Sequence, residues 1–318
     1  MTRIVGTTNT DGTGSATNLN VNNGQEISSS NSAPYVSYEE DNYFYSSLSI
    51  ENTTEWNADG LKEISITDLN GVEETTINNF VDVYITAHTD LTSSDDGEWS
   101  SLFSDISIYN AKRGYIDTTS ADDSTSYDDY ITISPISNGS SWSNLFEIQT
   151  GSGQDQVQFE STDGSTQYTE FDVDLGDDSD LFDYGLEAAA SQSQTRHVDG
   201  GSGDDFLYLS SDAVDLDFEN FEVVFGQDDR SLTLDQDILA KNDGLLIDKV
   251  AIDIADDYDT VSVTALSDDQ ISYIDQLSDS NPWTYLSSDE YYAVTVTYDA
   301  EEYTILTNDI DSDWLVSA

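Results

Sequence analysis

The chain lacks cysteine, and it has few prolines, little positive charge and no long hydrophobic run. Without Cys among its 318 residues it cannot form disulfides, thiolate zinc sites or a thiol nucleophile. Eight Lys and Arg residues stand against 65 Asp and Glu, so no basic patch is present for nucleic acid or an anionic membrane. No stretch is long enough for membrane insertion, and the first residues, MTRIVGTTNTDGTGS, contain no apolar segment of the signal-peptide type.

The formal charge of −57 sets a condition on folding. Only 36% of the residues are hydrophobic, but 19 Tyr, 11 Phe and 5 Trp indicate a folded chain rather than an acidic tail. A compact state with this excess of carboxylates repels itself unless cations bind or salt screens the field. Two explanations of the acidity stay open: bound divalent cations, or adaptation to a saline habitat.

Short alternating segments run through the chain from about residue 43 onward. Segments such as VDVYI (81–85) and FDVDL (171–175) alternate at period two and are bounded by Gly, Asp, Asn and Ser, which is typical of strands. With three prolines and almost no helical periodicity, the sequence predicts an all-β fold. We expect an extended N-terminal arm over residues 1–40, which are rich in Thr, Asn, Gly and Ser, and a strand-rich cap over 267–318.

The central part of the chain contains an internal repeat. Four glycines recur at an unbroken spacing of 25 residues: Gly151, Gly176, Gly201 and Gly226. Three of them are followed four residues later by an aspartate: Asp155, Asp180 and Asp205. Arg230 replaces the aspartate in the fourth copy. IADDYDTV (254–261) restores it after a longer interval, and SYDDYITI (126–133) is a degenerate earlier copy.

A repeat of this length, with one strand–turn–strand unit per copy, is typical of a solenoid. We predict a right-handed parallel β-helix, or β-solenoid, over residues 41–266, with about 25 residues per coil. Parallel strands stack about 4.8 Å apart, so equivalent aspartates form a column along one edge. Such a column is strongly repulsive unless a cation neutralises it.

Calcium fits this edge because it takes six to eight hard oxygen ligands, and glycine turns present backbone carbonyls beside the carboxylates. The alternative is that Asp and Gly are ordinary turn residues. We predict that turns of this kind lie between residues 150 and 260. The candidate calcium-site residues are Gly151, Gly153, Asp155, Gly176, Asp178, Asp180, Gly201, Gly203, Asp205, Asp228, Asp257 and Asp259.

These turns resemble a known family. GGSGDDFLY (200–208) matches the nonapeptide G-G-x-G-x-D-x-U-x of the RTX, or hemolysin-type, calcium-binding repeats. The matching residues are Gly200, Gly201, Gly203, Asp205 and Leu207. TGSGQDQVQ (150–158) and LGDDSDLFD (175–183) keep only part of the motif, and each 25-residue coil carries one motif where RTX repeats carry two per short coil.

The resemblance implies an RTX-like calcium-binding edge and a location outside the cell. RTX proteins leave the cell by type I secretion under an uncleaved C-terminal signal, and the tail NDIDSDWLVSA (308–318) is similar to such signals. In an extracellular protein, folding would be completed only after the chain meets calcium outside the cell.

We expect a structural role and no enzymatic activity, because the sequence shows no group of residues typical of a catalytic site. We expect a calcium-binding protein that assembles with copies of itself into a surface layer, filament or biofilm matrix, through the arm or the strand 292–298. Two alternatives stay open. One is a calcium-dependent adhesin or carbohydrate-binding module that uses Tyr and Trp on a cell-surface or matrix polysaccharide. The other is a polysaccharide-active β-helix enzyme with a carboxylate pair.

Overall fold

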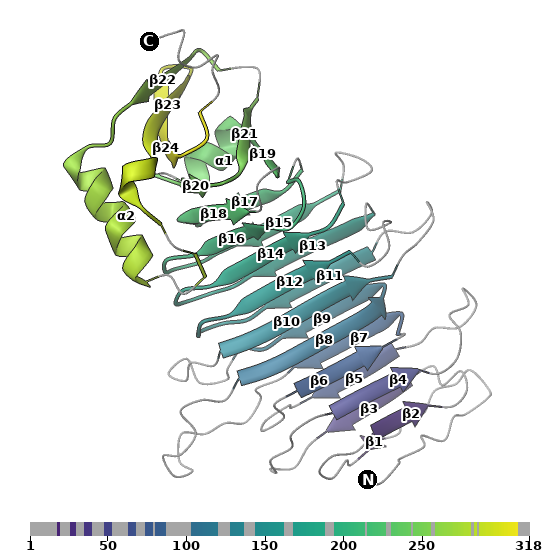
Figure 1. Cartoon of the computed structure of the whole chain (residues 1–318). Coiled ribbons are helices and arrows are strands. Elements are labelled where there is room, and N and C mark those ends of the chain that lie inside the picture. The colour runs from purple at the N-terminus through teal and green to yellow at the C-terminus, as the bar shows by residue number, and fades with distance from the viewer. Residues whose placement is uncertain are drawn as a thin grey trace.

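Two long parallel sheets make up most of the molecule (Figure 1). The computed structural model describes residues 18–19, 26–29, 35–39, 48–52, 63–67, 74–78, 80–86, 103–119, 128–136, 144–161, 168–187, 194–213, 215–226, 230–242, 244–255, 258–280, 283–284 and 286–310. Within these residues, successive strands as far as β18 alternate between a nine-stranded and a 13-stranded sheet. The chain is therefore mostly β with parallel pairing, as the alternating segments predicted.

The nine-stranded sheet consists, in spatial order, of β1 (Asn18–Leu19), β3 (Tyr35–Glu39), β5 (Glu63–Thr67), β7 (Asp82–Thr86), β9 (Arg113–Asp117), β11 (Asn144–Gln149), β13 (Thr169–Asp174), β15 (Arg196–Asp199) and β17 (Asp217–Glu219). The 13-stranded sheet consists of β2 (Glu26–Ser29), β4 (Leu48–Asn52), β6 (Glu74–Asn78), β8 (Phe103–Ala111), β10 (Asp128–Pro135), β12 (Gln156–Glu160), β14 (Leu181–Gly185), β16 (Phe206–Leu209), β18 (Val223–Gly226), β20 (Leu246–Asp248), β24 (Glu301–Thr307), β23 (Tyr292–Tyr298) and β22 (Thr260–Thr264). The remaining elements are β19 (Ser231–Leu234), β21 (Ala251–Ile254), α1 (Gln236–Lys241), α2 (Asp268–Ser280) and the 3-10 helix η1 (Ser288–Glu290).

The register confirms part of the predicted repeat. Leu181 pairs with Phe206, so neighbouring strands of the 13-stranded sheet are here 25 residues apart. Phe206 then pairs with Val223, and this interval is 17 residues. Gly226 consequently lies opposite Leu209 inside the sheet, and not beside the preceding glycine turn. The predicted fourth copy at Gly226 is wrong because the chain shortens both the turn and the return loop after β16.

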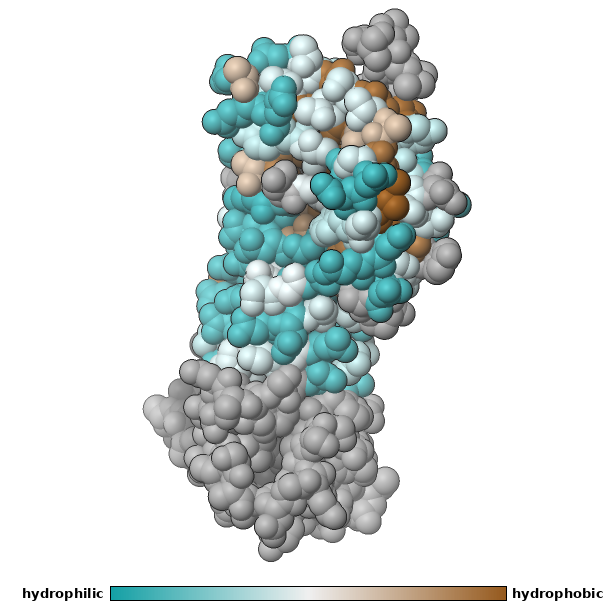
Figure 2. All heavy atoms as spheres, turned by 90° about the vertical axis from the view of Figure 1, so that its left-hand side faces the viewer, coloured by the Kyte–Doolittle hydropathy of each residue, from teal (hydrophilic) through white to brown (hydrophobic). Residues whose placement is uncertain are grey.

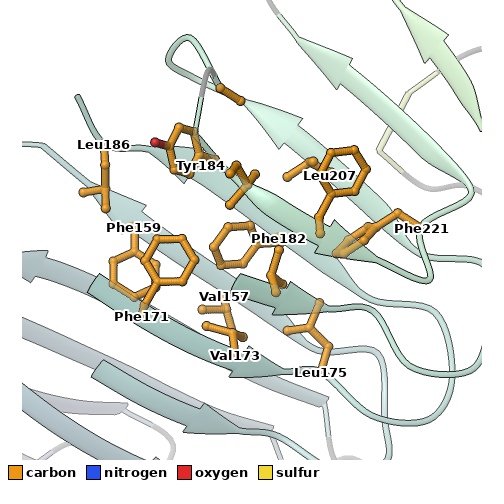
Figure 3. Close-up of a cluster of buried hydrophobic side chains, with 14 of the residues drawn as sticks. Val157, Phe159, Phe171, Val173, Leu175, Phe182, Tyr184, Leu186, Leu207 and Phe221 are labelled. Atoms are coloured by element: carbon orange, nitrogen blue, oxygen red, sulfur yellow. The ribbon is translucent and has the colours of Figure 1, made fainter. Parts of the chain in front are cut away.

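The main core lies between the two sheets. Inward and outward residues alternate along strands such as β11, where every second side chain is buried. Aromatic rings fill the space between the sheets: Phe159 of β12 stacks on Phe171 of β13, with 4.7 Å between ring centroids. Figure 3 shows these rings together with Val157, Val173 and other side chains that point from both sheets toward one another. The two-residue period of the sequence is thus the source of the core.

Three strands fall within the range that we expected to form a separate arm. β1 pairs with β3, and β3 with β5, while β2 pairs with β4, all in parallel. Residues 1–40 therefore contribute strands to both sheets within the described part of that range. The reason is local: YVSYE (35–39) has the same alternation as the strands after it.

The C-terminal end of the nine-stranded sheet is capped by side-chain hydrogen bonds. Asn242, which follows α1, donates from Nδ2 to the carbonyl of Phe218 on β17, at 2.9 Å. Its Oδ1 accepts a hydrogen bond from the backbone N–H of Phe221 at 3.0 Å. These contacts satisfy backbone groups at an edge that would otherwise be open to another strand.

The 13-stranded sheet continues beyond β20 with three further strands. β24 pairs in parallel with β20, and β23 and β22 continue the sheet in antiparallel order. The strand 292–298, which we expected to join a neighbouring subunit, is β23 and is paired on both sides. That expectation is wrong because the chain uses this strand to complete its own sheet.

Helix α2 differs from the expected strand-rich cap. It begins at a capping box: the Ser267 N–H donates to Gln270 Oε1 at 2.9 Å, and the Gln270 N–H donates to Ser267 Oγ at 3.3 Å. Ile274 and Leu277 are fully buried one turn apart. The SDDQ segment (267–270) was the sequence signal for this helix. No helix among the described residues has the length and apolar character that a membrane crossing requires.

Candidate functional site

The glycine turns stack directly on one another along one edge of the molecule. They connect β11 to β12, β13 to β14 and β15 to β16. The N–H of Asp177 donates to the carbonyl of Gly151, and the N–H of Ser202 donates to the carbonyl of Gly176, each at 2.7 Å. Ser152, Asp177 and Ser202 are joined by parallel bridges. The turns therefore form a short backbone ladder of their own between the two sheets.

The repeated glycines are required by this stacking. Gly176 has a φ of +102°, and a Cβ atom there would lie 1.8 Å from the carbonyl oxygen of Gly151. A Cβ on Gly201 would lie 1.9 Å from the oxygen of Gly176. Only glycine permits this approach and this backbone conformation together. Asp178 takes the place of a motif glycine with a φ of +82°, a region that Asp tolerates better than most residues.

The aspartates of the repeat form a continuous hydrogen-bonded column on the inner side of the turns. The Asp155 N–H donates to Asp180 Oδ1 at 2.7 Å, and the Asp180 N–H donates to Asp205 Oδ1 at 2.9 Å. The column extends at both ends, because the Asp129 N–H donates to Asp155 Oδ1 and the Asp205 N–H donates to Glu222 Oε2. We call these five residues the carboxylate ladder: Asp129, Asp155, Asp180, Asp205 and Glu222.

The three central carboxylates are buried and only half satisfied. Asp155, Asp180 and Asp205 are each 0% exposed. Among the described residues, no hydrogen-bond partner lies within reach of the second oxygen, Oδ2, of any of the three. A buried carboxylate oxygen without a partner is costly, and the cost is relieved by a proton or a cation.

Burial shifts Asp155, Asp180, Asp205 and Glu222 toward the neutral form by raising their pKa values. It raises the pKa of Asp180 to about 10, and the pKa of Asp155 to about 8 with help from the Asp129 charge. The pKa of Asp205 rises to about 8 and that of Glu222 to about 7, in both cases chiefly through burial. At neutral pH these groups bind a proton unless a cation takes its place.

The structure brings together nine of the twelve candidate site residues. The turns hold Gly151, Gly153, Asp155, Gly176, Asp178, Asp180, Gly201, Gly203 and Asp205. Asp259 lies elsewhere: it is exposed, immediately precedes β22, and its N–H donates to the carbonyl of Thr297 at 2.7 Å. Asp228 and Asp257 lie outside the described residues.

Two members of the ladder were not among the candidates. Asp129 belongs to the copy at 126–133 that the sequence marked as degenerate, and its place in the column follows from a 26-residue interval. Glu222 follows Asp205 after only 17 residues and carries one more methylene, which reaches across the shortened turn. A strict 25-residue search cannot find either residue.

The ladder carboxylates supply hard oxygen donors, but they do not make a complete cation site by themselves. Among the described residues, no three His, Cys, Asp or Glu side chains converge closely enough to hold a metal ion by themselves. A cation beside Asp155, Asp180 and Asp205 would therefore draw on carbonyl oxygens of the stacked turns in addition to the carboxylates. Mixed carboxylate and carbonyl ligation is the kind that calcium takes.

Comparison with known proteins adds no family. A scan against protein-family models found no match, and searches of curated proteins and of solved structures found none. The functional argument therefore depends on the geometry of the turns and the ladder.

Proposed function

We propose that this protein is an extracellular, calcium-binding structural protein built on a right-handed parallel β-helix. The observation that carries the proposal is the row of buried Oδ2 atoms without hydrogen-bond partners on Asp155, Asp180 and Asp205. Calcium would replace protons there, and it would tie each turn to the next. In this role the ion is a structural ligand, and no enzymatic step is part of the proposal.

The winding of the chain supports the solenoid. Each repeat consists of one strand in the nine-stranded sheet, a glycine turn and one strand in the 13-stranded sheet, followed by a return loop. Like positions are adjacent in both sheets: Phe171 of β13, for example, pairs with Arg196 of β15. The resemblance of residues 200–208 to RTX repeats also supports a calcium-binding role for the edge formed by the turns. It further implies type I secretion, with residues 308–318 as the signal.

Self-assembly is the second part of the proposal. At the C-terminal end, Asn242 caps β17 of the nine-stranded sheet, and the 13-stranded sheet continues through β24 and β23 to its last strand, β22. Among the described strands, β1 and β2 end the sheets on the opposite side. We propose that β1 and β2 pair with strands of another copy, since the last strand of a sheet is a template for pairing.

A calcium titration tests the proposal. Chelator-treated protein is titrated with calcium while the thermal midpoint is followed by circular dichroism and assembly by light scattering. Sodium chloride at matched ionic strength is the control. A rise in midpoint at millimolar calcium or below, followed by scattering, supports the proposal. A rise that sodium chloride reproduces in full would leave the acidity as a habitat adaptation.

Carbohydrate binding is a second candidate, and one observation favours it. Tyr84 of β7 and Tyr115 of β9 are direct neighbours on the outer face of the nine-stranded sheet. Tyr84 is 43% exposed. Adjacent aromatic rings on a flat face offer a platform for sugar rings. Retention of the protein on an insoluble polysaccharide, and its loss in a Tyr84→Ala variant, would support this candidate; equal retention of both proteins would count against it.

A further inference from the structure

The outer face of the 13-stranded sheet carries a second apolar cluster at its C-terminal end. Its first column consists of residues at equivalent positions on β14, β16, β18 and β20: Leu181, Phe206, Val223 and Leu246. All four are buried, although they point away from the main core. We call them the docking column, because the segment that contains α2 packs on them.

Helix α2 supplies the other side of this cluster. Ile274 and Leu277 of α2 are both 0% exposed and belong to the same cluster as the docking column. Trp283, just beyond the helix, lies against Phe206 with 5.0 Å between ring centroids. Figure 1 shows α2 beside the C-terminal strands, and the face in Figure 2 carries hydrophobic residues in its upper part and hydrophilic ones below.

The docking column and the carboxylate ladder share one backbone. Three docking residues directly follow ladder residues in the chain: Leu181 follows Asp180, Phe206 follows Asp205, and Val223 follows Glu222. Since side chains alternate along a strand, the carboxylates face the turn interior while the next residues face α2. A displacement of the ladder therefore moves the surface that α2 contacts.

Backbone hydrogen bonds also connect the docking column to the carboxylate ladder. The N–H groups of Leu181, Phe206, Val223 and Leu246 donate to ladder carbonyls one strand earlier: Asp155 at 2.9 Å, Asp180 at 2.9 Å, Asp205 at 3.1 Å and Glu222 at 2.9 Å. Each of the first three docking residues is thus held by two ladder residues, one through the peptide bond and one through a hydrogen bond.

We propose that a cation bound at the carboxylate ladder controls α2: the bound cation fixes the spacing of the turns and keeps the helix docked on the outer face of the sheet, and loss of the cation loosens the docked helix. The inference rests on the proposed calcium function. A cation shared by oxygens of neighbouring turns fixes the distance between those turns, and its loss leaves that distance free to change. A change in that distance displaces the docking column. A helix of 13 residues has little stability of its own and follows its docking surface.

Hydrogen exchange tests the coupling in the intact chain. Exchange is measured by mass spectrometry with calcium and with chelator, well below the thermal midpoint and in a constant background of about 0.5 M sodium chloride to screen the general charge. We expect chelation to speed exchange of the α2 amides by about 5- to 150-fold, the range typical of coupled sites. The amides of β8, which lies outside the ladder, keep their protection.

The same experiment distinguishes a failure of the coupling from a failure of calcium binding. Calcium protection of the turns without any effect on α2 would overturn the coupling and leave calcium binding intact. An absence of calcium effects on both the turns and α2 would overturn the calcium function and the coupling together. Equal loss of protection in β8 and α2 would show opening of the whole fold, and would also overturn the coupling as stated.

Linkage gives an independent test from the side of the helix. Leu277→Asp places a charge in the buried contact and detaches α2, whereas Ile271→Asp changes an apolar side chain of the same helix that is 36% exposed. Because coupling is reciprocal, Leu277→Asp is expected to weaken calcium binding by the same 5- to 150-fold range, measured by calorimetry. Ile271→Asp is expected to bind like the wild type. Equal affinities of the two variants would contradict the proposal.

Discussion

At the scale of single residues, the ladder gives the calcium-free protein an unusual pH dependence. The pKa values of Asp155 and Asp205 rise to about 8 and that of Asp180 to about 10, whereas unfolded aspartates titrate near 4. The folded state therefore binds more protons than the unfolded state above pH 4, and stability falls as pH rises through 8 toward 10. In chelator, we expect the thermal midpoint to drop by more than ~10 °C between pH 5 and pH 9.

Calcium is expected to reverse this trend, since the ion binds the ionised carboxylates and competes with protons. The thermal midpoint at saturating calcium should stay constant or increase over the same pH range. A chelated protein that gains stability between pH 5 and pH 9 would show that the ladder carboxylates are ionised without help from a metal.

Arg196 is another residue whose contribution to stability depends on its burial. Its side chain is 0% exposed and lies in the main core. It donates to the carbonyls of Thr169 at 2.9 Å and Glu187 at 2.7 Å, and to the hydroxyl of Tyr184. Asp215, at 3.4 Å, supplies the opposite charge.

We expect Arg196→Ala to lower the free energy of unfolding by about 3–5 kcal/mol, because it leaves buried polar groups and a carboxylate without their partner. Lys241→Ala is the matched control, since Lys241 pairs with Asp217 at 2.8 Å and both side chains reach solvent, with exposures of 33% and 50%. Exposed pairs contribute about 0–1 kcal/mol. Urea unfolding followed by circular dichroism measures both variants. A similar loss in both would contradict the importance of burial.

At the scale of the element, the turn is defined by how closely backbones approach. Gly176→Ala would place a Cβ 1.8 Å from the Gly151 oxygen at a φ of +102°, and we expect a loss of about 3 kcal/mol or more. Gly244→Ala is the control: φ is +81°, but no atom lies within 4 Å of the added Cβ. It should cost about 1–2 kcal/mol. Equal losses in chemical denaturation would mean that backbone strain alone, and not stacking, requires the glycine.

The sequence predicted the turns because local and long-range requirements coincide there. Gly176 and Gly201 need a positive φ, and they also need the space of a neighbouring strand, so both reasons select the same residue type at one period. Strand alternation predicted the core for a similar reason, since the two-residue period follows from strand geometry. These features are visible without knowledge of the partner strand.

Other features depend on the register that tertiary packing selects. Glu222 enters the ladder because the turn before it is shorter, and no repeat search finds it at 17 residues from Asp205. Helix α2 has a recognisable capping box at Ser267 and Gln270. The burial of its two apolar residues, however, depends on the outer face of β14 to β20, with which they form one cluster. Period alone does not reveal an outer sheet face that another segment covers.

At the scale of the whole molecule, two sources of charge repulsion must be separated. The formal charge of −57 acts over the whole surface and is screened by any salt, with a Debye length of about 3 Å at 1 M. The ladder is a short buried row that screening reaches poorly. Replacement of Asp155, Asp180 and Asp205 by Asn together changes the formal charge by only three units but removes the carboxylates of the central row.

The triple Asn variant is therefore expected to lose the calcium response and keep the salt response. A ligand stabilises the folded state only through the site that binds it, so calcium should no longer raise the thermal midpoint beyond what sodium chloride does at equal ionic strength. The increase in midpoint between low and molar sodium chloride should match that of the wild type, because the surface carboxylates are unchanged. Asp172→Asn, on the exposed outer face of β13, is the single-site control and should keep both responses. If the triple variant responds to calcium as the wild type does, the ions act on the surface charge and the ladder is a proton-bound structural element.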